Sequence, residues 1–129
     1  MDTKALLEMF ERDRFVKLVG IKIASVTENG AVCTLDAVDS HLNANDGVQG
    51  GAIYTLADFA FAVAANAGGV VTPTLNSSIS YIRAARCGML TATATPVHSG
   101  RTTCVYTVNV TDEQGKLIAV GNFTGARRG

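Results

Sequence analysis

Residues 50–69 read GGAIYTLADFAFAVAANAGG, and this stretch decides which fold the chain can adopt. Gly50 and Gly51 open the segment, and Gly68 and Gly69 close it, as glycines often do at helix ends. The residues between them are apolar on every side of a helix. A helix without a polar face is buried inside a protein rather than lying on its surface. The stretch therefore predicts one long core helix.

Strand patterns on both sides of this helix indicate how it is buried. Residues 21–27 and 31–38 are apolar runs joined by Glu28-Asn29-Gly30, and Asn-Gly is typical of a tight hairpin turn. After Pro73 four more strands are expected, the first two as a pair: residues 74–83, 89–98, 104–111 and 117–125. Consecutive strands with short turns favour an antiparallel sheet. We therefore expect an α+β fold in which a curved antiparallel sheet wraps around the buried helix.

The two ends of the chain carry weaker signals. Residues 3–13, within an N-terminal segment of residues 1–14, predict a short amphipathic helix. Residues 126–129, which include Arg127 and Arg128, are expected to fray; binding a phosphate group is the alternative for these arginines. The chain shows no repeat or linker, so residues 1–129 are expected to form a single domain.

The composition excludes several classes of protein. Hydrophobic residues make up 47% of the chain and charged residues 17%, which excludes a disordered chain and suggests apolar surface buried between subunits. Eleven basic residues balance eleven acidic ones, so nothing favours nucleic acid or a membrane surface as a partner. The apolar run Ala52–Ala67 is too short to span a bilayer, and the N-terminus lacks the apolar run of a signal peptide.

The cysteine pattern points to a reducing compartment. The chain has three cysteines, an odd number, without CxxC spacing. This pattern argues against a disulfide framework and against a zinc site. We expect reduced thiols, a cytoplasmic protein and no bound metal.

Asp58 is the first candidate for chemistry. It lies in the middle of the predicted helix with apolar residues on both sides. Burial raises the pKa of a carboxyl group, which brings it toward the range useful for a general base. The alternative is a structural role, in which Asp58 is hydrogen-bonded locally or points into solvent.

Gly50 and Gly51 are the second candidate, because they lie at the start of the helix. The first N–H groups of a helix have no partner within it, and the positive end of the helix dipole lies behind them. Such N–H groups can stabilise a carbonyl oxygen that becomes an oxyanion. A plain Gly-Gly turn is the alternative. Asn43, in the preceding loop, could orient a water or a carbonyl, or could form an Asx turn.

Several spacings match a known family at once. The segments concerned are His41-Leu42-Asn43, Gly47-Val48-Gln49-Gly50-Gly51, Leu56-Ala57-Asp58 and Ala64-Ala65-Asn66. Together they resemble the signature of hotdog-fold acyl-CoA thioesterases, and most of all the phenylacetate-pathway, PaaI-type, group. The likeness covers roughly residues 15–126. The resemblance implies the hotdog fold, a homodimer whose sheets join edge to edge, and two dimers that could join as a tetramer.

The resemblance also assigns roles to residues. It implies that Asp58 acts on an acyl-CoA thioester as general base or nucleophile, that Gly50 donates its N–H to the thioester oxygen, and that Asn43 and Thr74 place water or the thioester. Asp58 and Thr74 would face Gly50 and Asn43 of the other subunit. The residues expected to contact the substrate are Gln49, Gly51, Ser99, Gly100 and Arg101, the last three near the coenzyme A phosphates. Coenzyme A is part of the substrate, so no separate cofactor is implied.

One departure from the family pattern keeps other functions open. The family often has histidine where this chain has Gln49, and glutamine can form hydrogen bonds but carries no proton at neutral pH. The same pocket could therefore belong to a non-catalytic acyl-CoA carrier. A hotdog hydratase or dehydratase is the other alternative, and it would need a histidine beside the carboxylate. Phe10, Phe15 and Tyr54 fit either an acyl pocket or the core.

Overall fold

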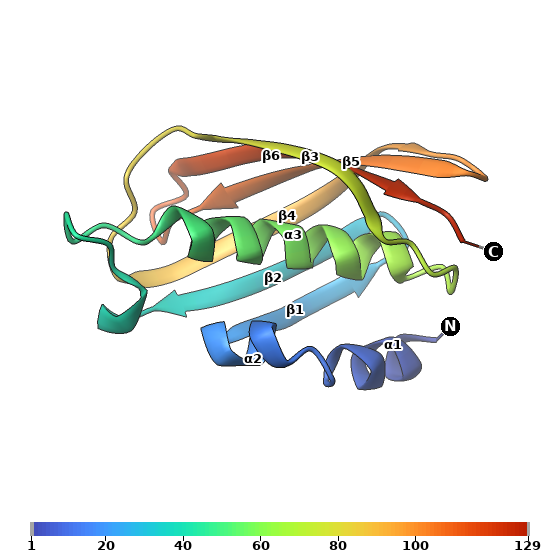
Figure 1. The fold of residues 1–129 in the computed structure, drawn as a ribbon, viewed down its shortest axis with the longest axis horizontal. Coiled ribbons are helices and arrows are strands. Elements are labelled where there is room, and N and C mark those ends of the chain that lie inside the picture. The colour runs from blue at the N-terminus through green and yellow to red at the C-terminus, as the bar shows by residue number, and fades with distance from the viewer. Residues whose placement is uncertain (1, 129) are drawn as a thin grey trace.

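The computed structural model describes residues 2–128, which form one sheet, one long central helix and two short N-terminal helices (Figure 1). The helices are α1 (Thr3–Phe10), α2 (Arg14–Val19), the 3-10 turn η1 (Asp39–His41) and α3 (Gly50–Asn66). The strands are β1 (Ile21–Thr27), β2 (Gly30–Ala37), β3 (Thr74–Tyr81), β4 (Gly88–Ser99), β5 (Thr103–Thr111) and β6 (Leu117–Ala126). Of these described residues, none forms a helix long and apolar enough to cross a membrane.

The six strands pair antiparallel in the order β1-β2-β4-β5-β6-β3, and α3 lies along one face of the sheet (Figure 1). Phe61, Leu56 and Val63 of α3 have no exposed surface, as expected for a helix that is apolar all round. The prediction of a sheet wrapped around a buried helix is confirmed. The hairpin at Glu28–Gly30 is confirmed as well, because Gly30 begins β2 and pairs with Thr27.

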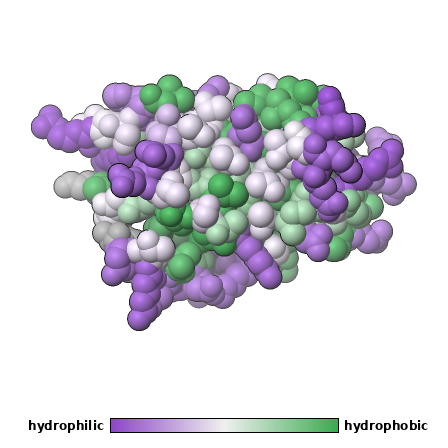
Figure 2. Space-filling view, turned by 180° about the vertical axis from the view of Figure 1, so that it is seen from behind, coloured by the Kyte–Doolittle hydropathy of each residue, from purple (hydrophilic) through white to green (hydrophobic). Residues whose placement is uncertain are grey.

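The opposite face of the sheet is turned away from α3 and is seen in Figure 2. Hydrophilic residues (purple) gather mostly toward the edges of this view, and the middle is largely pale with small hydrophobic (green) patches. The alternation along β4 explains this, because Leu90 and Ala92 are buried against the helix while Thr91 and Thr93 lie on the outer side. Only one face of the sheet contributes to the core.

The expected pairing of residues 74–83 with 89–98 is wrong. β3 pairs with β6, with Ile79 opposite Gly121, whereas β4 lies between β2 and β5. Residues 82–87 carry the chain from the edge of the sheet to its middle, which a tight hairpin turn cannot do. We expected these two strands to pair because they follow each other in the sequence. In the structure α3 lies between β2 and β3 along the chain, and β3 takes its place at the far edge of the sheet.

Gly121 provides the close contact that the sequence allowed. A Cβ atom at this position would lie 2.9 Å from the Phe123 ring and 3.0 Å from the carbonyl oxygen of Ser78 on β3. Neither distance leaves room for a methyl group unless the Phe123 ring and the Ser78 backbone shift. The glycine therefore lets β3 and β6 approach each other at the edge of the sheet.

The N-terminal segment also differs from the expected single helix over residues 3–13. α1 ends at Phe10, and the Asp13 side chain accepts a hydrogen bond from the Val16 backbone N–H at 3.1 Å, so that α2 begins. Gly20, with φ of +96°, ends α2. An aspartate N-cap three residues after the first helix was the missed signal.

Candidate functional site

Asp58 and Thr74 lie together on the side of α3 that β3 approaches. Thr74 is the first residue of β3, and its Oγ1 donates to Oδ1 of Asp58 at 3.3 Å. Asp58 is half-buried. Burial raises the pKa of the Asp58 carboxyl, the Thr74 hydrogen bond lowers it, and the negative charge of Asp13 raises it further. The net shift is upward from 3.8, as a general base requires.

The start of α3 leaves one N–H group free. The Gln49 side chain accepts from the Gly51 N–H at 3.4 Å, and the Gln49 carbonyl oxygen accepts from the N–H groups of Ala52 and Ile53. The N–H of Gly50 donates to no atom within residues 2–128. The expectation that both glycines present free N–H groups is therefore wrong for Gly51. Among the described residues at the start of α3, only Gly50 therefore offers a free N–H donor at the positive end of the helix.

Tyr81 holds the residue that carries this donor. Its hydroxyl donates to the Gly50 carbonyl oxygen at 3.1 Å, and its ring lies 3.4 Å from the place where a Cβ atom at position 50 would be. Tyr81 is the last residue of β3, so the sheet edge and the helix start are tied together. No sequence signal identified this contact, because the two residues are 31 positions apart.

Asn43 adopts the Asx turn and also lies beside Gly50. Its Oδ1 accepts from the backbone N–H groups of Asn45 at 2.9 Å and Gly47 at 3.1 Å. The side-chain NH2 group has no partner within the described residues and remains a donor. Asn43 and Gly50 line one cavity of about 300 Å³, together with Arg83. Asn43 therefore forms the Asx turn with its side-chain oxygen and keeps a free amide nitrogen.

A larger groove of about 680 Å³ also borders the start of the helix. Its apolar lining includes Phe15, Leu42 and Tyr54, and Gln49 and Gly51 lie at its polar side. Phe15 is 60% exposed and is therefore not a core residue. Phe10, by contrast, packs edge-on against Phe59 of α3, with ring centroids 5.2 Å apart, as a core residue does.

One chain holds the two halves of the expected site apart. Asp58 follows Gly50 by eight residues, which at 1.5 Å per residue is about 12 Å along the axis of α3. A reacting carbonyl group needs its base and its oxyanion donor each within about 3 Å. The structure therefore brings Asp58 to Thr74, and Gly50 to Asn43, but does not bring these pairs together within the chain.

The turn Ser99–Gly100–Arg101 joins β4 to β5 beside the C-terminal end of α3 (Figure 1). Arg127 donates from Nη2 to the Ser99 hydroxyl at 2.8 Å and from Nε to the Gly100 carbonyl oxygen at 3.4 Å. Arg101 is exposed and forms no ion pair or hydrogen bond within residues 2–128. The turn lies at the opposite end of α3 from Gly50.

The expected frayed tail is wrong for residues 126–128, and residue 129 lies outside the described residues. Ala126 ends β6, and the Arg128 N–H donates to the Val71 carbonyl oxygen at 2.8 Å. Arg127 also reaches the last turn of α3, where Nη1 donates to the Ala65 carbonyl oxygen at 2.5 Å. A cation at the C-terminal end of a helix is favourable, and this contact holds the tail in place.

No group of three or more metal-binding side chains occurs in the described part of the chain. His41, one of two histidines, directs both ring nitrogens at backbone atoms. Nδ1 contacts the Val38 N–H at 2.9 Å, and Nε2 contacts the Val19 carbonyl oxygen at 2.6 Å. His41 is therefore part of the loop structure.

Comparisons with known proteins identify the family of the chain. The model of the thioesterase superfamily matches residues 47–119. Acyl-coenzyme A thioesterase PaaI of Escherichia coli (strain K12) is 36% identical over 113 residues, which cover 87% of this chain and 81% of that protein.

Solved structures extend the likeness to the whole fold. The E. coli PaaI protein from the phenylacetic acid degradation operon superposes with a TM-score of 0.93 at 34% identity, covering 98% of this chain and 92% of that one. A hypothetical thioesterase of Streptococcus pneumoniae TIGR4, solved with coenzyme A, gives a TM-score of 0.88 at 31% identity, covering 95% and 97% of the two chains. The fold is thus the hotdog fold of PaaI-type thioesterases, and the chain belongs to the thioesterase superfamily.

The raised pKa of Asp58 predicts a pH-dependent effect on stability. Above pH 3.8 the unfolded chain ionises this carboxyl more easily than the folded chain does, so its charge destabilises the fold at neutral pH. We expect Asp58→Asn to raise the Tm at pH 7 and to leave it unchanged at a pH below 3.8. Thermal unfolding of both proteins across this range measures the effect. A lower Tm for the variant at pH 7 would contradict the upward shift.

Proposed function

We propose that the protein hydrolyses the thioester bond of an acyl-CoA to a free acid and coenzyme A, in a site shared between two subunits. The observation that carries the proposal is the pair of half-sites on α3. One holds a carboxyl with a raised pKa, and the other holds a free N–H at the start of the helix. Acyl transfer needs both groups at one carbonyl carbon.

The proposed chemistry follows from these two groups. The Gly50 N–H donates to the thioester oxygen and strengthens its hydrogen bond as the oxygen gains negative charge. Asp58 either takes a proton from the attacking water or attacks the carbonyl carbon itself, which forms an anhydride that water then cleaves. Thr74 orients the carboxylate, and Asn43 places the thioester or the water. The thiolate of coenzyme A is the leaving group in both routes.

The proposed partner is a second copy of the chain, joined along β3. β3 is the last strand of the sheet, so one of its edges has no neighbour within residues 2–128. Leu75, Tyr81 and Ile82 are 65%, 51% and 53% exposed there. An unpaired edge with apolar side chains favours pairing with another strand. Leu18, 81% exposed on α2, offers a further apolar contact through which two dimers could form a tetramer.

The substrate assignment rests on the shape of the groove and on the relatives. The groove of about 680 Å³ beside Gly50 is lined by Phe15, Tyr54 and Tyr81, which suits a bulky, aromatic acyl group. The S. pneumoniae structure contains coenzyme A, which supports a coenzyme A ester as the substrate. We assign the phosphates of coenzyme A to the Ser99–Arg101 turn, where Arg101 has no protein partner within residues 2–128. The reaction then needs neither a metal nor a separate cofactor.

The assay is the release of free thiol from aryl-acyl and alkyl-acyl coenzyme A esters in the cytoplasmic pH range. Release by the wild type and not by Asp58→Asn supports the proposal. Binding of the esters without release would favour an acyl-CoA carrier instead. A hydratase is less well supported, because His41 is committed to backbone contacts and does not face Asp58.

Mixed dimers test whether the site is shared. Asp58→Asn and a variant that lacks the Gly50 N–H should each be inactive as homodimers. Co-expression should restore about a quarter of wild-type activity, because half of the dimers are mixed and each has one intact site. The measurement is thiol release by the mixture. If mixing restores nothing, Asp58 and Gly50 do not meet across an interface.

A further inference from the structure

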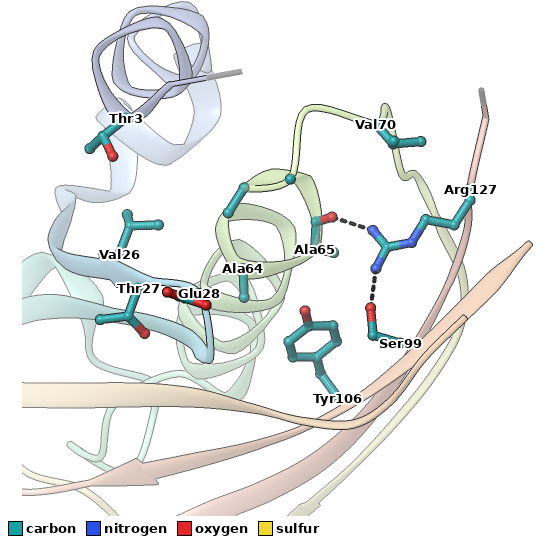
Figure 3. Close-up of a pocket in the computed structure, with 12 residues that line it drawn as sticks. Thr3, Val26, Thr27, Glu28, Ala64, Ala65, Val70, Ser99, Tyr106 and Arg127 are labelled. Atoms are coloured by element: carbon teal, nitrogen blue, oxygen red, sulfur yellow. Dashed lines mark hydrogen bonds between the residues drawn. The ribbon is translucent and has the colours of Figure 1, made fainter. Parts of the chain in front are cut away.

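A second cavity, of about 390 Å³, lies at the end of α3 that is farthest from Gly50 (Figure 3). One wall comes from the β1–β2 hairpin, where Val26, Thr27 and Glu28 line it. The other wall comes from the last turn of α3 and the segment after it. None of Asn43, Gly50, Asp58 and Thr74 lines this cavity, but Ser99 does, so the cavity lies away from these four residues and adjoins the turn proposed for the coenzyme A phosphates.

Arg127 borders the cavity and carries a positive charge that no anion within residues 2–128 balances. Its guanidinium group has five N–H donors. Four hydrogen bonds go to neutral acceptors: the Ala65 carbonyl and Thr72 hydroxyl from Nη1, the Gly100 carbonyl from Nε and the Ser99 hydroxyl from Nη2. No carboxylate in that range forms an ion pair with it. One N–H on Nη2 remains beyond these four hydrogen bonds, available to the Tyr106 oxygen or to a ligand.

Tyr106 supplies a second donor on the floor of the cavity. Its side chain is only 5% exposed and its ring packs edge-on against Phe61, but its hydroxyl points toward the space between α3 and Arg127 (Figure 3). The hydroxyl donates to no atom in the described chain. Burial raises the pKa of Tyr106, and the positive charge of Arg127 and a hydrogen bond from its side chain partly offset this shift, so the O–H stays protonated at neutral pH. The Tyr106 hydroxyl is not among buried polar atoms that lack a partner, so it opens to the cavity, where its hydrogen can be donated to a ligand.

We propose that this cavity binds the carboxylate of a small organic acid, with the Nη2 group of Arg127 and the hydroxyl of Tyr106 as its two donors. Two donors match the two oxygens of a carboxylate. Glu28 on the opposite wall disfavours a dianion. Val26, Ala64 and Val70 provide apolar surface for the body of the acid.

The test is calorimetric titration of the whole protein with benzoate and hexanoate. Benzamide is the neutral control, and inorganic phosphate is the dianionic control. We expect an acid to bind, and both controls to bind at least roughly tenfold more weakly, because a charged hydrogen bond is lost or a dianion meets Glu28. Tyr106→Phe should weaken binding roughly 3- to 10-fold, the effect of one hydrogen bond. Arg127→Gln should weaken it roughly 10- to 100-fold.

Tyr81→Phe is the matched control, since it removes the same atom at the other end of α3 and should leave acid binding unchanged. Weaker binding in Tyr81→Phe but not in Tyr106→Phe would place the acid at the candidate catalytic site and overturn the proposal. Equal binding of benzoate and benzamide, or no binding of either acid at millimolar concentration, would overturn it too. Because Arg127 also holds the C-terminal segment, Tyr106→Phe keeps the test valid if Arg127→Gln does not fold. Thiol release by Tyr106→Phe should persist, which separates this inference from the proposed function.

Discussion

Asp58→Asn is expected to lower the rate of thiol release roughly 1,000-fold, because it removes the base or nucleophile and leaves the shape of the side chain. The amide oxygen of the substituted side chain would still accept the Thr74 hydrogen bond, so the fold around the half-site is retained. Steady-state kinetics with the best acyl-CoA of the panel give the effect on kcat and KM. The expected change is in kcat.

Thr74→Val is the matched variant for this first prediction. It keeps a side chain of similar shape and removes the hydroxyl that donates to Asp58 at 3.3 Å. Because that hydrogen bond lowers the pKa of Asp58, its loss should move the acidic limb of the rate profile to higher pH. The variant should therefore remain active at alkaline pH. Near-normal turnover by Asp58→Asn would refute the assigned role of the carboxyl, whatever Thr74→Val does.

Gly50→Pro is expected to reduce kcat roughly 100- to 1,000-fold, the usual effect of removing one oxyanion donor. Proline lacks the N–H that Gly50 presents and is well accepted at the first position of a helix. The preceding residue, Gln49, has φ of −57° and ψ of 132°, an extended conformation that proline permits. The variant thus removes one hydrogen-bond donor from the site while preserving the helix, which circular dichroism can verify.

Gly50→Ala is the control for the second prediction. It retains the N–H and places a Cβ atom 3.4 Å from the Tyr81 ring, an ordinary packing distance. We expect a smaller loss than in Gly50→Pro, seen more in KM than in kcat because the methyl group hinders approach of the thioester. Equal kinetic parameters for the two variants would show that the Gly50 N–H is not the oxyanion donor.

The helix and its carboxylate could be predicted because their signals are local. The apolar stretch with Asp58 in its middle implies burial and a raised pKa by itself, and the structure has both, although Asp58 is only half-buried. The Asn-Gly hairpin and the antiparallel sheet follow from equally local patterns. Asn43 was a candidate from its place in the loop before the helix, whereas the role of Thr74 came from the resemblance to a family, and the structure adds the Thr74 hydrogen bond to Asp58.

The errors share a different cause. Each wrong prediction concerns a group that pairs with a partner other than the expected one. β3 pairs with β6, Arg127 forms hydrogen bonds within the protein, and Gln49 takes up the Gly51 N–H. For Arg127 that partner is Ala65, which is 62 positions away. A sequence pattern shows that a polar group or a strand edge requires a hydrogen-bond partner. It does not show which of several available groups lies within hydrogen-bond distance.

The sequence alone determined that this chain builds a sheet around one buried helix, and that this helix carries a carboxyl group in its middle and a free amide at its start. These properties depend on hydrophobic periodicity and on helix geometry, which act over a few residues. The tertiary structure alone decided that β3 forms the edge of the sheet, that Tyr81 holds Gly50, and that Arg127 and Tyr106 border a second cavity. Such contacts depend on how distant segments meet, and packing selects one arrangement among many with similar local preferences.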